Sequence, residues 1–166
     1  DAGHGWDALV AHTVSRGLSG LEALSGIPGS VGAAPVQNIG AYGQELADSL
    51  ESLTVLLPRT GEVLELPAPA CAFGYRTSVF KQAGSAMRDA IVLEVRLRLS
   101  KAPPQAPRYA ELARALDTTS PARSAEVRAT VLRLRRAKSM VLDPEDANFR
   151  SAGSFFTNPI VPTSVA

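Results

Sequence analysis

The chain has 166 residues, of which 45% are hydrophobic and 20% are charged, and its formal net charge is +1. This composition is typical of a folded protein with one core, or with one core and part of another. The balanced charge and the few aromatic residues argue against a nucleic-acid surface, and no apolar run approaches the roughly 20 residues that cross a bilayer.

An amphipathic helix is predicted over residues 6–16. Apolar residues recur there at helical spacing, and Gly17 follows at a position where a helix commonly ends. Ser19 and Glu22 have the spacing of a capping box, which predicts a second, short helix over residues 21–24.

Residues 26–43 are the most informative segment. They include five glycines and two prolines but no charged side chain. A disordered linker typically carries more charge and less Val and Ile, whereas glycines let a backbone approach a ligand closely and expose its N–H groups. We interpret the segment as an ordered wall against a large cofactor, and the alternative is a tight structural loop beneath a core.

Strands are predicted in the middle of the chain. Residues 51–57 and 62–66 have the pattern of a hairpin around the turn 58–61. Residues 73–81 are predicted to form a turn that leads into a short strand. In residues 91–99 every odd-numbered position is apolar, which predicts a half-buried strand with those side chains in the core.

The prolines of residues 101–108 predict a linker or an exposed loop. Ser120 and Pro121 then predict the start of a helix that ends among the basic residues 135–138, where cations suit the unpaired carbonyls. We expect this helix to bury Val127, Val131 and Leu134. Another strand is predicted at residues 152–157. Because helices and strands mix without a regular alternation, the predicted fold class is α+β.

Cys71 is the only cysteine, which excludes an internal disulfide and fits a reducing cytosol. It lies between two alanines, so we interpret it as a core residue rather than a nucleophile. The histidines, His4 and His12, lie on or beside the first predicted helix, without the partners that a zinc site or a serine triad needs. We therefore expect no metal site.

Two isolated polar residues are candidates for chemistry. Arg76 lies in an otherwise neutral turn, where it could bind a carboxylate or stabilise developing negative charge, or form a surface ion pair. Ser154 lies between a glycine and two bulky apolar residues that would shield its hydroxyl from water, although it could equally begin a strand. Candidates for holding a diphosphate, each of which could also be an ordinary solvated side chain, are Tyr109, Arg135, Lys138 and Asn158.

Five blocks of the sequence resemble the UDP-N-acetylenolpyruvoylglucosamine reductase family, also called the MurB family. The longest are Gln-Asn-Ile-Gly-Ala-Tyr-Gly at 37–43, Phe-Gly-Tyr-Arg-Thr-Ser-Val-Phe-Lys at 73–81 and Gly-Ser-Phe-Phe-Thr-Asn-Pro at 153–159. Shorter blocks lie at 20–22 and 27–29. The blocks occur in order over nearly the whole chain.

The resemblance implies part of a PCMH-type FAD-binding domain at 1–118, followed by the beginning of a C-terminal substrate-binding domain at 119–166. It implies a cytoplasmic, monomeric flavoenzyme of peptidoglycan synthesis, without nucleic-acid or membrane partners. In this family NADPH reduces FAD, and the flavin reduces UDP-N-acetylglucosamine enolpyruvate to UDP-N-acetylmuramate.

The resemblance also implies residue roles. Arg76 would stabilise charge beside the enolpyruvyl carboxylate, and Ser154 would protonate the adjacent carbon, which such a weak acid can do only near cations. The residues implied to contact FAD are Ile27, Pro28, Gly29, Gly32, Ala33, Gln37, Asn38, Ile39, Gly40, Ala41, Tyr42 and Gly43. Those implied to contact substrate are Tyr75, Tyr109, Lys138 and Asn158, with Tyr109 on a loop that closes over it.

Two parts of the family pattern have no counterpart in these residues: a segment that contacts the FAD pyrophosphate and a catalytic glutamate. We therefore expect an internal fragment that retains FAD weakly or not at all and has no turnover. Two other interpretations remain open. One is a different flavoenzyme of the same broad fold, such as an oxidase of small alcohols, and the other is a UDP-sugar binding module without catalysis.

Overall fold

The structure is a computed structural model that describes residues 1–116, 122–149, 158 and 160–165. Its α-helices are α1 (Trp6–Ser15), α2 (Ala110–Leu116) and α3 (Ser124–Arg136). Its strands are β1 (Gly40–Ala41), β2 (Gln44–Glu45), β3 (Leu50–Leu57), β4 (Glu62–Pro67) and β5 (Ile91–Leu97). Short 3-10 helices lie at Glu22–Leu24, Ala34–Gln37, Leu46–Asp48, Ala68–Cys71 and Thr163–Val165. The predicted α+β class is confirmed.

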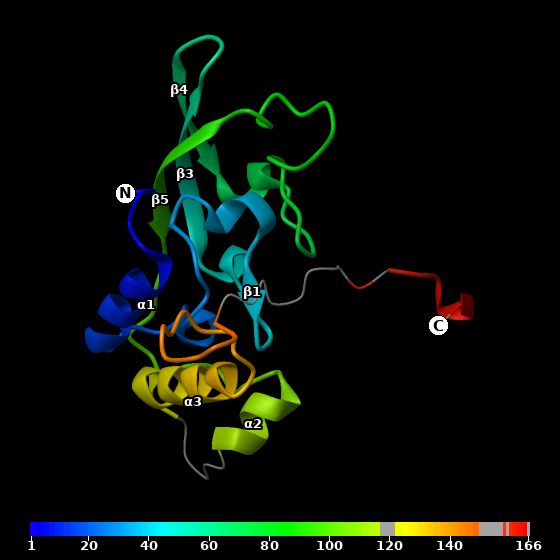
Figure 1. Cartoon of the computed structure of the whole chain (residues 1–166). Coiled ribbons are helices and arrows are strands. Elements are labelled where there is room, and N and C mark those ends of the chain that lie inside the picture. The colour runs from blue at the N-terminus through cyan, green and yellow to red at the C-terminus, as the bar shows by residue number, and fades with distance from the viewer. Residues whose placement is uncertain (117–121, 150–157, 159, 166) are drawn as a thin grey trace.

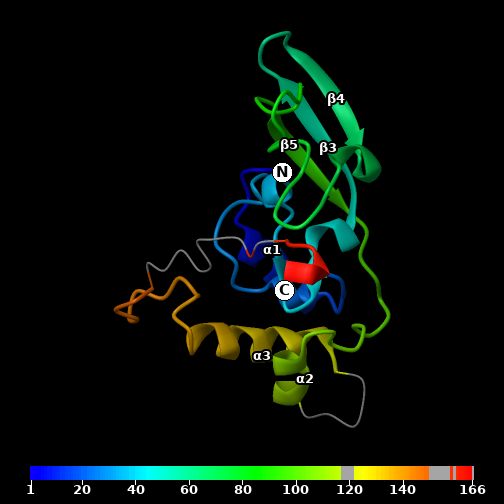
Figure 2. The same cartoon turned by 90° about the vertical axis from the view of Figure 1, so that its right-hand side faces the viewer.

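The glycine-rich residues lie between a sheet and a pair of helices. Strand β3 is the centre of an antiparallel sheet with the order β4-β3-β5, which extends at one end of the molecule (Figures 1 and 2). Helices α2 and α3 lie at the other end, with α1 in between (Figure 1). Strands β1 and β2 form a separate small ribbon. None of the helices in the described ranges combines the length and apolar character that a membrane span requires.

The first predicted helix and the hairpin are confirmed. Helix α1 corresponds to the prediction over 6–16, and its side chains Trp6 and Val10 are buried in a core with Leu24. The indole Nε1 of Trp6 donates a hydrogen bond to the Leu24 carbonyl at 3.0 Å. Strands β3 and β4 pair through the predicted turn 58–61. In each case a local pattern of apolar residues coincides with the surface that becomes buried.

The short helix predicted over 21–24 is present, but its predicted capping box is wrong. The Ser19 hydroxyl donates instead to the Ala102 carbonyl at 2.8 Å. The Glu22 carboxylate accepts the N–H groups of Gly20 and Leu21 at 2.7 and 3.1 Å. The serine therefore joins two distant segments rather than the first turn of the helix, because a tertiary partner competes for its hydroxyl.

The predicted strand at 91–99 exists as β5. Its predicted buried face is confirmed at Val95 and Leu97, which pack against the core, and is wrong at Ile91 and Leu93. Thr54 of β3 pairs with Glu94 of β5, but the next residue, Val55, pairs with Val92. Leu93 is therefore the extra residue of a β-bulge. As a result Ile91 and Leu93 are 50% and 39% exposed, whereas Val92 packs against the core beside the sheet. A bulge interrupts the two-residue period from which the face was predicted.

The strand predicted within 73–81 is wrong, because these described residues form turns. The backbone N–H of each of Gly74 and Thr77 donates a hydrogen bond to the carbonyl of the other at 3.2 Å. These backbone groups therefore find their partners inside the loop. Phe80 is buried against Cys71 in the core beside the sheet. The interpretation of Cys71 as a core residue is thus confirmed.

The predicted C-terminal helix is observed as α3. Its residues Val127 and Val131 are buried, and they pack with Ala23 and Leu112 in a third core, so that α3 covers the helix Glu22–Leu24. Helix α2 was not predicted. Helix α3 begins at Ser124, with Arg123 as its N-cap, so the predicted start at Ser120 and Pro121 is wrong. The strand expected at residues 152–157 lies outside the described residues.

Candidate functional site

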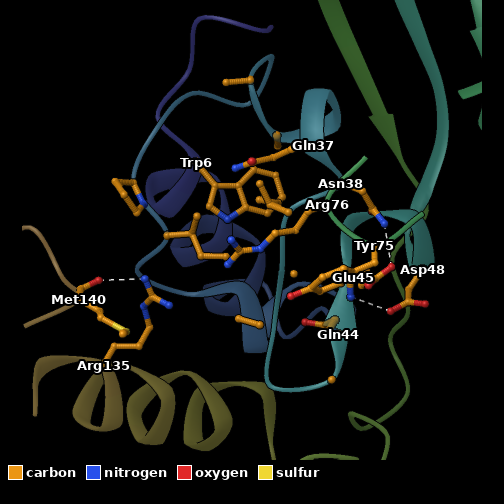
Figure 3. A pocket seen from close by; sticks show the side chains of 18 of the residues that line it. Trp6, Gln37, Asn38, Gln44, Glu45, Asp48, Tyr75, Arg76, Arg135 and Met140 are labelled. Atoms are coloured by element: carbon orange, nitrogen blue, oxygen red, sulfur yellow. Dashed lines mark hydrogen bonds between the residues drawn. The ribbon is translucent and has the colours of Figure 1, made fainter. Parts of the chain in front are cut away.

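A cavity of about 880 Å³ lies beside the glycine-rich segment (Figure 3). This volume is in the range of sites that hold small molecules and cofactors. Nine of the twelve residues that the resemblance assigned to FAD line it: Ile27, Pro28, Ala33, Gln37, Asn38, Ile39, Gly40, Ala41 and Gly43. The other walls come from α1, from the loop that carries Tyr75 and Arg76, and from α3.

The buried side chain of Asn38 is central to the wall. Its Nδ2 donates to the Glu45 carboxylate at 2.7 Å and to the Gly74 carbonyl at 3.3 Å, and its Oδ1 accepts the Ala47 N–H at 3.0 Å. Its backbone is left-handed, with φ of 45°, a conformation that asparagine tolerates better than most residues. Asn38 therefore joins three parts of the wall, and its polar atoms have partners within the protein.

The loop that carries Arg76 is bound to the wall. The Ser78 hydroxyl donates to the Val36 carbonyl at 2.6 Å, in addition to the bond from Asn38. Arg76 has a left-handed φ of 50°, and its carbonyl accepts from Lys81 Nζ at 3.0 Å. Backbone conformations of this kind cost about 1–3 kcal/mol and cluster at functional sites. Its side chain extends into the cavity (Figure 3), so Arg76 and the uncharged wall face the same space.

A second guanidinium, that of Arg135 on α3, lies on the opposite side of the cavity (Figure 3). Its Nη2 donates to the carbonyls of Gly26 and Met140 at 3.3 and 2.9 Å. Burial lowers the pKa of Arg135. Its Nε is buried without a hydrogen-bond partner among the described residues, which costs about 1–3 kcal/mol. An anionic oxygen from a bound molecule would satisfy this donor.

Several residues that line the cavity were not predicted: Trp6, Gln44, Glu45, Asp48, Lys81, Arg108 and Met140. The carboxylates among them stabilise the wall itself, because Glu45 accepts from Asn38, and Asp48 accepts the Glu45 N–H at 2.8 Å. Lys81 ends a block of the resemblance, and Gln44 and Glu45 directly follow the wall, so their positions in the sequence could have suggested them. The others belong to segments that only folding brings to the cavity. Within the described ranges, no group of three or more His, Cys, Asp or Glu could hold a metal ion.

Three predicted cofactor residues do not line the cavity: Gly29, Gly32 and Tyr42. Gly32 has a structural reason to be glycine, because a Cβ there would lie 2.5 Å from the Cβ of Ala2. Tyr42 packs edge-to-face against Tyr109, with 5.7 Å between ring centroids. Gly29 is exposed, and its carbonyl accepts the Trp6 N–H at 2.9 Å.

The predicted substrate residues are not gathered around the cavity. Tyr75 lines it, and Tyr109 is exposed beside Tyr42. Lys138 Nζ is held by both carboxylate oxygens of Glu111, at 2.7 and 2.8 Å, and this bond raises the pKa of Lys138.

The two remaining predictions fall at the C-terminal end of the chain. Asn158 is exposed. Ser154 lies outside the described residues, so its distance from Arg76 remains a matter of prediction.

Comparisons with known proteins identify a family of flavoprotein reductases that the chain resembles. Residues 1–67 match the family model described as FAD binding domain. The chain is 51% identical to UDP-N-acetylenolpyruvoylglucosamine reductase of Salinispora arenicola, over 97% of this chain and 44% of that protein. It is 53% identical to the reductase of the same name from Nocardia farcinica, over 98% of this chain and 42% of that protein. Over nearly its whole length the chain is therefore similar to UDP-N-acetylenolpyruvoylglucosamine reductases.

A solved structure of this reductase family is also similar. The crystal structure of UDP-N-acetylenolpyruvylglucosamine reductase (MurB) from Thermus caldophilus has a TM-score of 0.57 and 31% identity. The similarity covers 80% of this chain and 40% of the Thermus caldophilus chain. The chain thus spans less than half the length of the reductases it matches.

Proposed function

We propose that this chain supplies the cofactor-side wall and the catalytic arginine of an NADPH- and FAD-dependent reductase. The substrate is UDP-N-acetylglucosamine enolpyruvate, and the product is UDP-N-acetylmuramate for peptidoglycan synthesis. The observation that carries the proposal is that Arg76 and the uncharged wall line one cavity of about 880 Å³. Identity near one half to reductases of this name, such as the 51% shared with the Salinispora arenicola protein, supports the choice of substrate.

The residues around the cavity fit FAD. The wall between Ile27 and Gly43 has no charged side chain, which suits a large, flat and largely apolar ring system. The buried Nε of Arg135 offers a donor to a phosphate or carboxylate oxygen. Bound FAD would supply the hydride, taken from NADPH, that reduces the enolpyruvyl double bond.

Arg76 would act on the substrate. A guanidinium presents a planar pair of donors that can bind a carboxylate, and it stabilises negative charge that develops next to it. The bonds from Asn38 and Ser78 hold the loop in place before substrate arrives, so little reorganisation is needed.

The other assignments follow from the family resemblance and form part of the proposal. Ser154 is the proton donor, and Tyr75, Tyr109 and Asn158 contact substrate. Lys138 also binds the diphosphate, which must then take the place of the Glu111 carboxylate. The domain division is 1–118 and 119–166, and the protein is a cytoplasmic monomer that binds neither nucleic acid nor membrane.

Changing Arg76→Ala in the full-length reductase tests the proposal. Loss of one charge-stabilising donor typically costs 10²–10³ in rate, so we expect reoxidation of reduced FAD by the enolpyruvyl substrate to slow by about 10²-fold. Reduction of FAD by NADPH should not change, and stopped-flow absorbance at the flavin band measures both half-reactions. The matched control is Arg59→Ala, in the exposed turn between β3 and β4. Equal rates in the two variants would contradict the role of Arg76.

A further inference from the structure

The backbone of Gly26 forms hydrogen bonds with side chains of two helices. Its N–H donates to Asp7 Oδ1 of α1 at 2.6 Å, and its carbonyl accepts from Arg135 Nη2 of α3 at 3.3 Å. Gly26 is buried and has a φ of 73°, which few residues other than glycine adopt. The next residue, Ile27, is the first of the glycine-rich wall to line the cavity.

The carboxylate of Asp7 is itself fixed by Arg128 of α3. Arg128 Nη1 donates to Oδ1 at 2.6 Å, and Nη2 donates to Oδ2 at 2.8 Å. The side chains are 16% exposed for Arg128 and 41% for Asp7. The hydrogen bond from Arg128 lowers the pKa of Asp7, although partial burial acts in the opposite direction. Such a bidentate pair fixes both the position and the plane of the carboxylate.

Helix α3 touches Gly26 along a single face. Arg128, Leu132 and Arg135 follow one another at spacings of four and three residues, which places them on the same side of the helix. A Cβ at Gly26 would lie 2.9 Å from Leu132 Cδ2. The helix therefore packs directly against Gly26, where the cavity wall begins.

We propose that Asp7 and Arg128 are positioning residues of the cofactor site. The Asp7 carboxylate accepts the Gly26 N–H and so holds the first residues of the wall in place. Arg128 holds that carboxylate in the orientation that this hydrogen bond requires. The inference rests on the proposed function, because it assigns to these residues an effect on FAD affinity. The competing explanation is an ion pair that only ties α1 to α3, which would affect stability and nothing else.

Two substitutions of one residue separate the explanations. Asp7→Asn and Asp7→Leu both remove the charge and have similar size, but only asparagine keeps an oxygen that can accept the Gly26 N–H. The dissociation constant of FAD is measured in the full-length reductase by fluorescence titration with FAD, alongside the melting temperature. We expect Asp7→Leu to bind FAD about tenfold more weakly than Asp7→Asn. Equal affinities in the two variants would overturn the inference.

A charge reversal provides a second, independent measurement. Asp7→Arg combined with Arg128→Asp can restore the ion pair between α1 and α3, but it removes the acceptor for the Gly26 N–H. We expect the double variant to regain melting temperature relative to Asp7→Leu while FAD affinity stays about tenfold below that of the unchanged reductase. Recovery of FAD affinity together with melting temperature would show that the pair only links the helices.

The controls separate this inference from the proposed function. Glu126→Gln breaks an exposed ion pair with Arg123 at the start of the same helix and should leave FAD affinity unchanged. If the unchanged full-length reductase binds no FAD, the proposed function fails, and the inference with it. If it binds FAD and the Asp7 variants do not differ, the inference alone fails.

Discussion

Asn38 shows how one side chain determines the shape of the cavity. It was predicted as a cofactor contact, and it does line the cavity, but its three hydrogen bonds go to Glu45, Gly74 and Ala47. A net contribution of about 1 kcal/mol is usual for each such bond. Its main physical effect is therefore to join the segments of Glu45, Ala47 and the Arg76 loop to the wall.

Replacing Asn38→Ala should lower the free energy of unfolding by about 2–4 kcal/mol, because three bonds are lost and alanine is disfavoured in a left-handed conformation. Asn38→Gly should cost about 1 kcal/mol less, since glycine adopts that conformation without strain. Urea denaturation measures both variants. A loss below about 0.5 kcal/mol for Asn38→Ala, the range of neutral surface changes, would contradict this role.

The buried thiol of Cys71 predicts a dependence of stability on alkaline pH. Burial raises its pKa from 9.0 to about 11, so the folded protein keeps the proton at pH values where the unfolded chain has lost it. Raising the pH from about 9 to about 11 therefore favours the unfolded state. The difference in unfolding free energy between wild type and Cys71→Ala should shrink over this range. A constant difference would contradict the assignment.

Helix α3 is held in place mainly by its apolar face. Val131 is fully buried, at 0% exposed, and packs with Ala23 and Leu112, whereas the surface of the helix is strongly basic. Because α3 carries both Arg128 and Arg135, its packing also sets the position of the guanidinium that lines the cavity. The stability of this contact can be tested without touching any polar residue.

Val131→Ala should reduce the free energy of unfolding by about 2 kcal/mol, since it removes two buried methyl groups and leaves a cavity. The matched control is Val63→Ala on β4, where the valine is 56% exposed, and its effect should stay within about 0.5 kcal/mol. Denaturant unfolding of the two variants gives the comparison. Similar losses in both would show that α3 is not docked through Val131.

The chain as given spans 44% of the length of the Salinispora arenicola reductase, and its cavity is lined by the glycine-rich wall and by three arginines, Arg76, Arg108 and Arg135. A protein that forms only some of the contacts to a cofactor binds that cofactor with lower affinity.

We therefore predict that the isolated 166-residue chain retains FAD weakly or not at all and has no turnover. Incubation with FAD, gel filtration and the absorbance of the eluted protein near the flavin band measure retention, and NADPH oxidation measures turnover. A stoichiometrically yellow protein that oxidises NADPH in the presence of the enolpyruvyl substrate would contradict this prediction.

The local features of this protein could be predicted from the sequence. The helix α1, the hairpin of β3 and β4, the buried face of α3 and the ordered glycine-rich wall all depend on periodicity, turn residues and composition within short stretches. The resemblance added Arg76 and the wall as parts of one site, and nine of the twelve wall residues do line the cavity. These properties depend on neighbours along the chain, which a sequence displays directly.

Only the tertiary structure decided which distant groups meet. The bulge at Leu93 leaves Ile91 and Leu93 exposed, the Glu111 carboxylate pairs with the Lys138 ammonium group, and Asp7 contacts Arg128, which lies 121 positions away in the sequence. The residues in these contacts are far apart in the sequence, so no periodic pattern along the chain connects them. Their partners are selected by packing and by the need to pair buried polar groups, and both act only once the chain has folded.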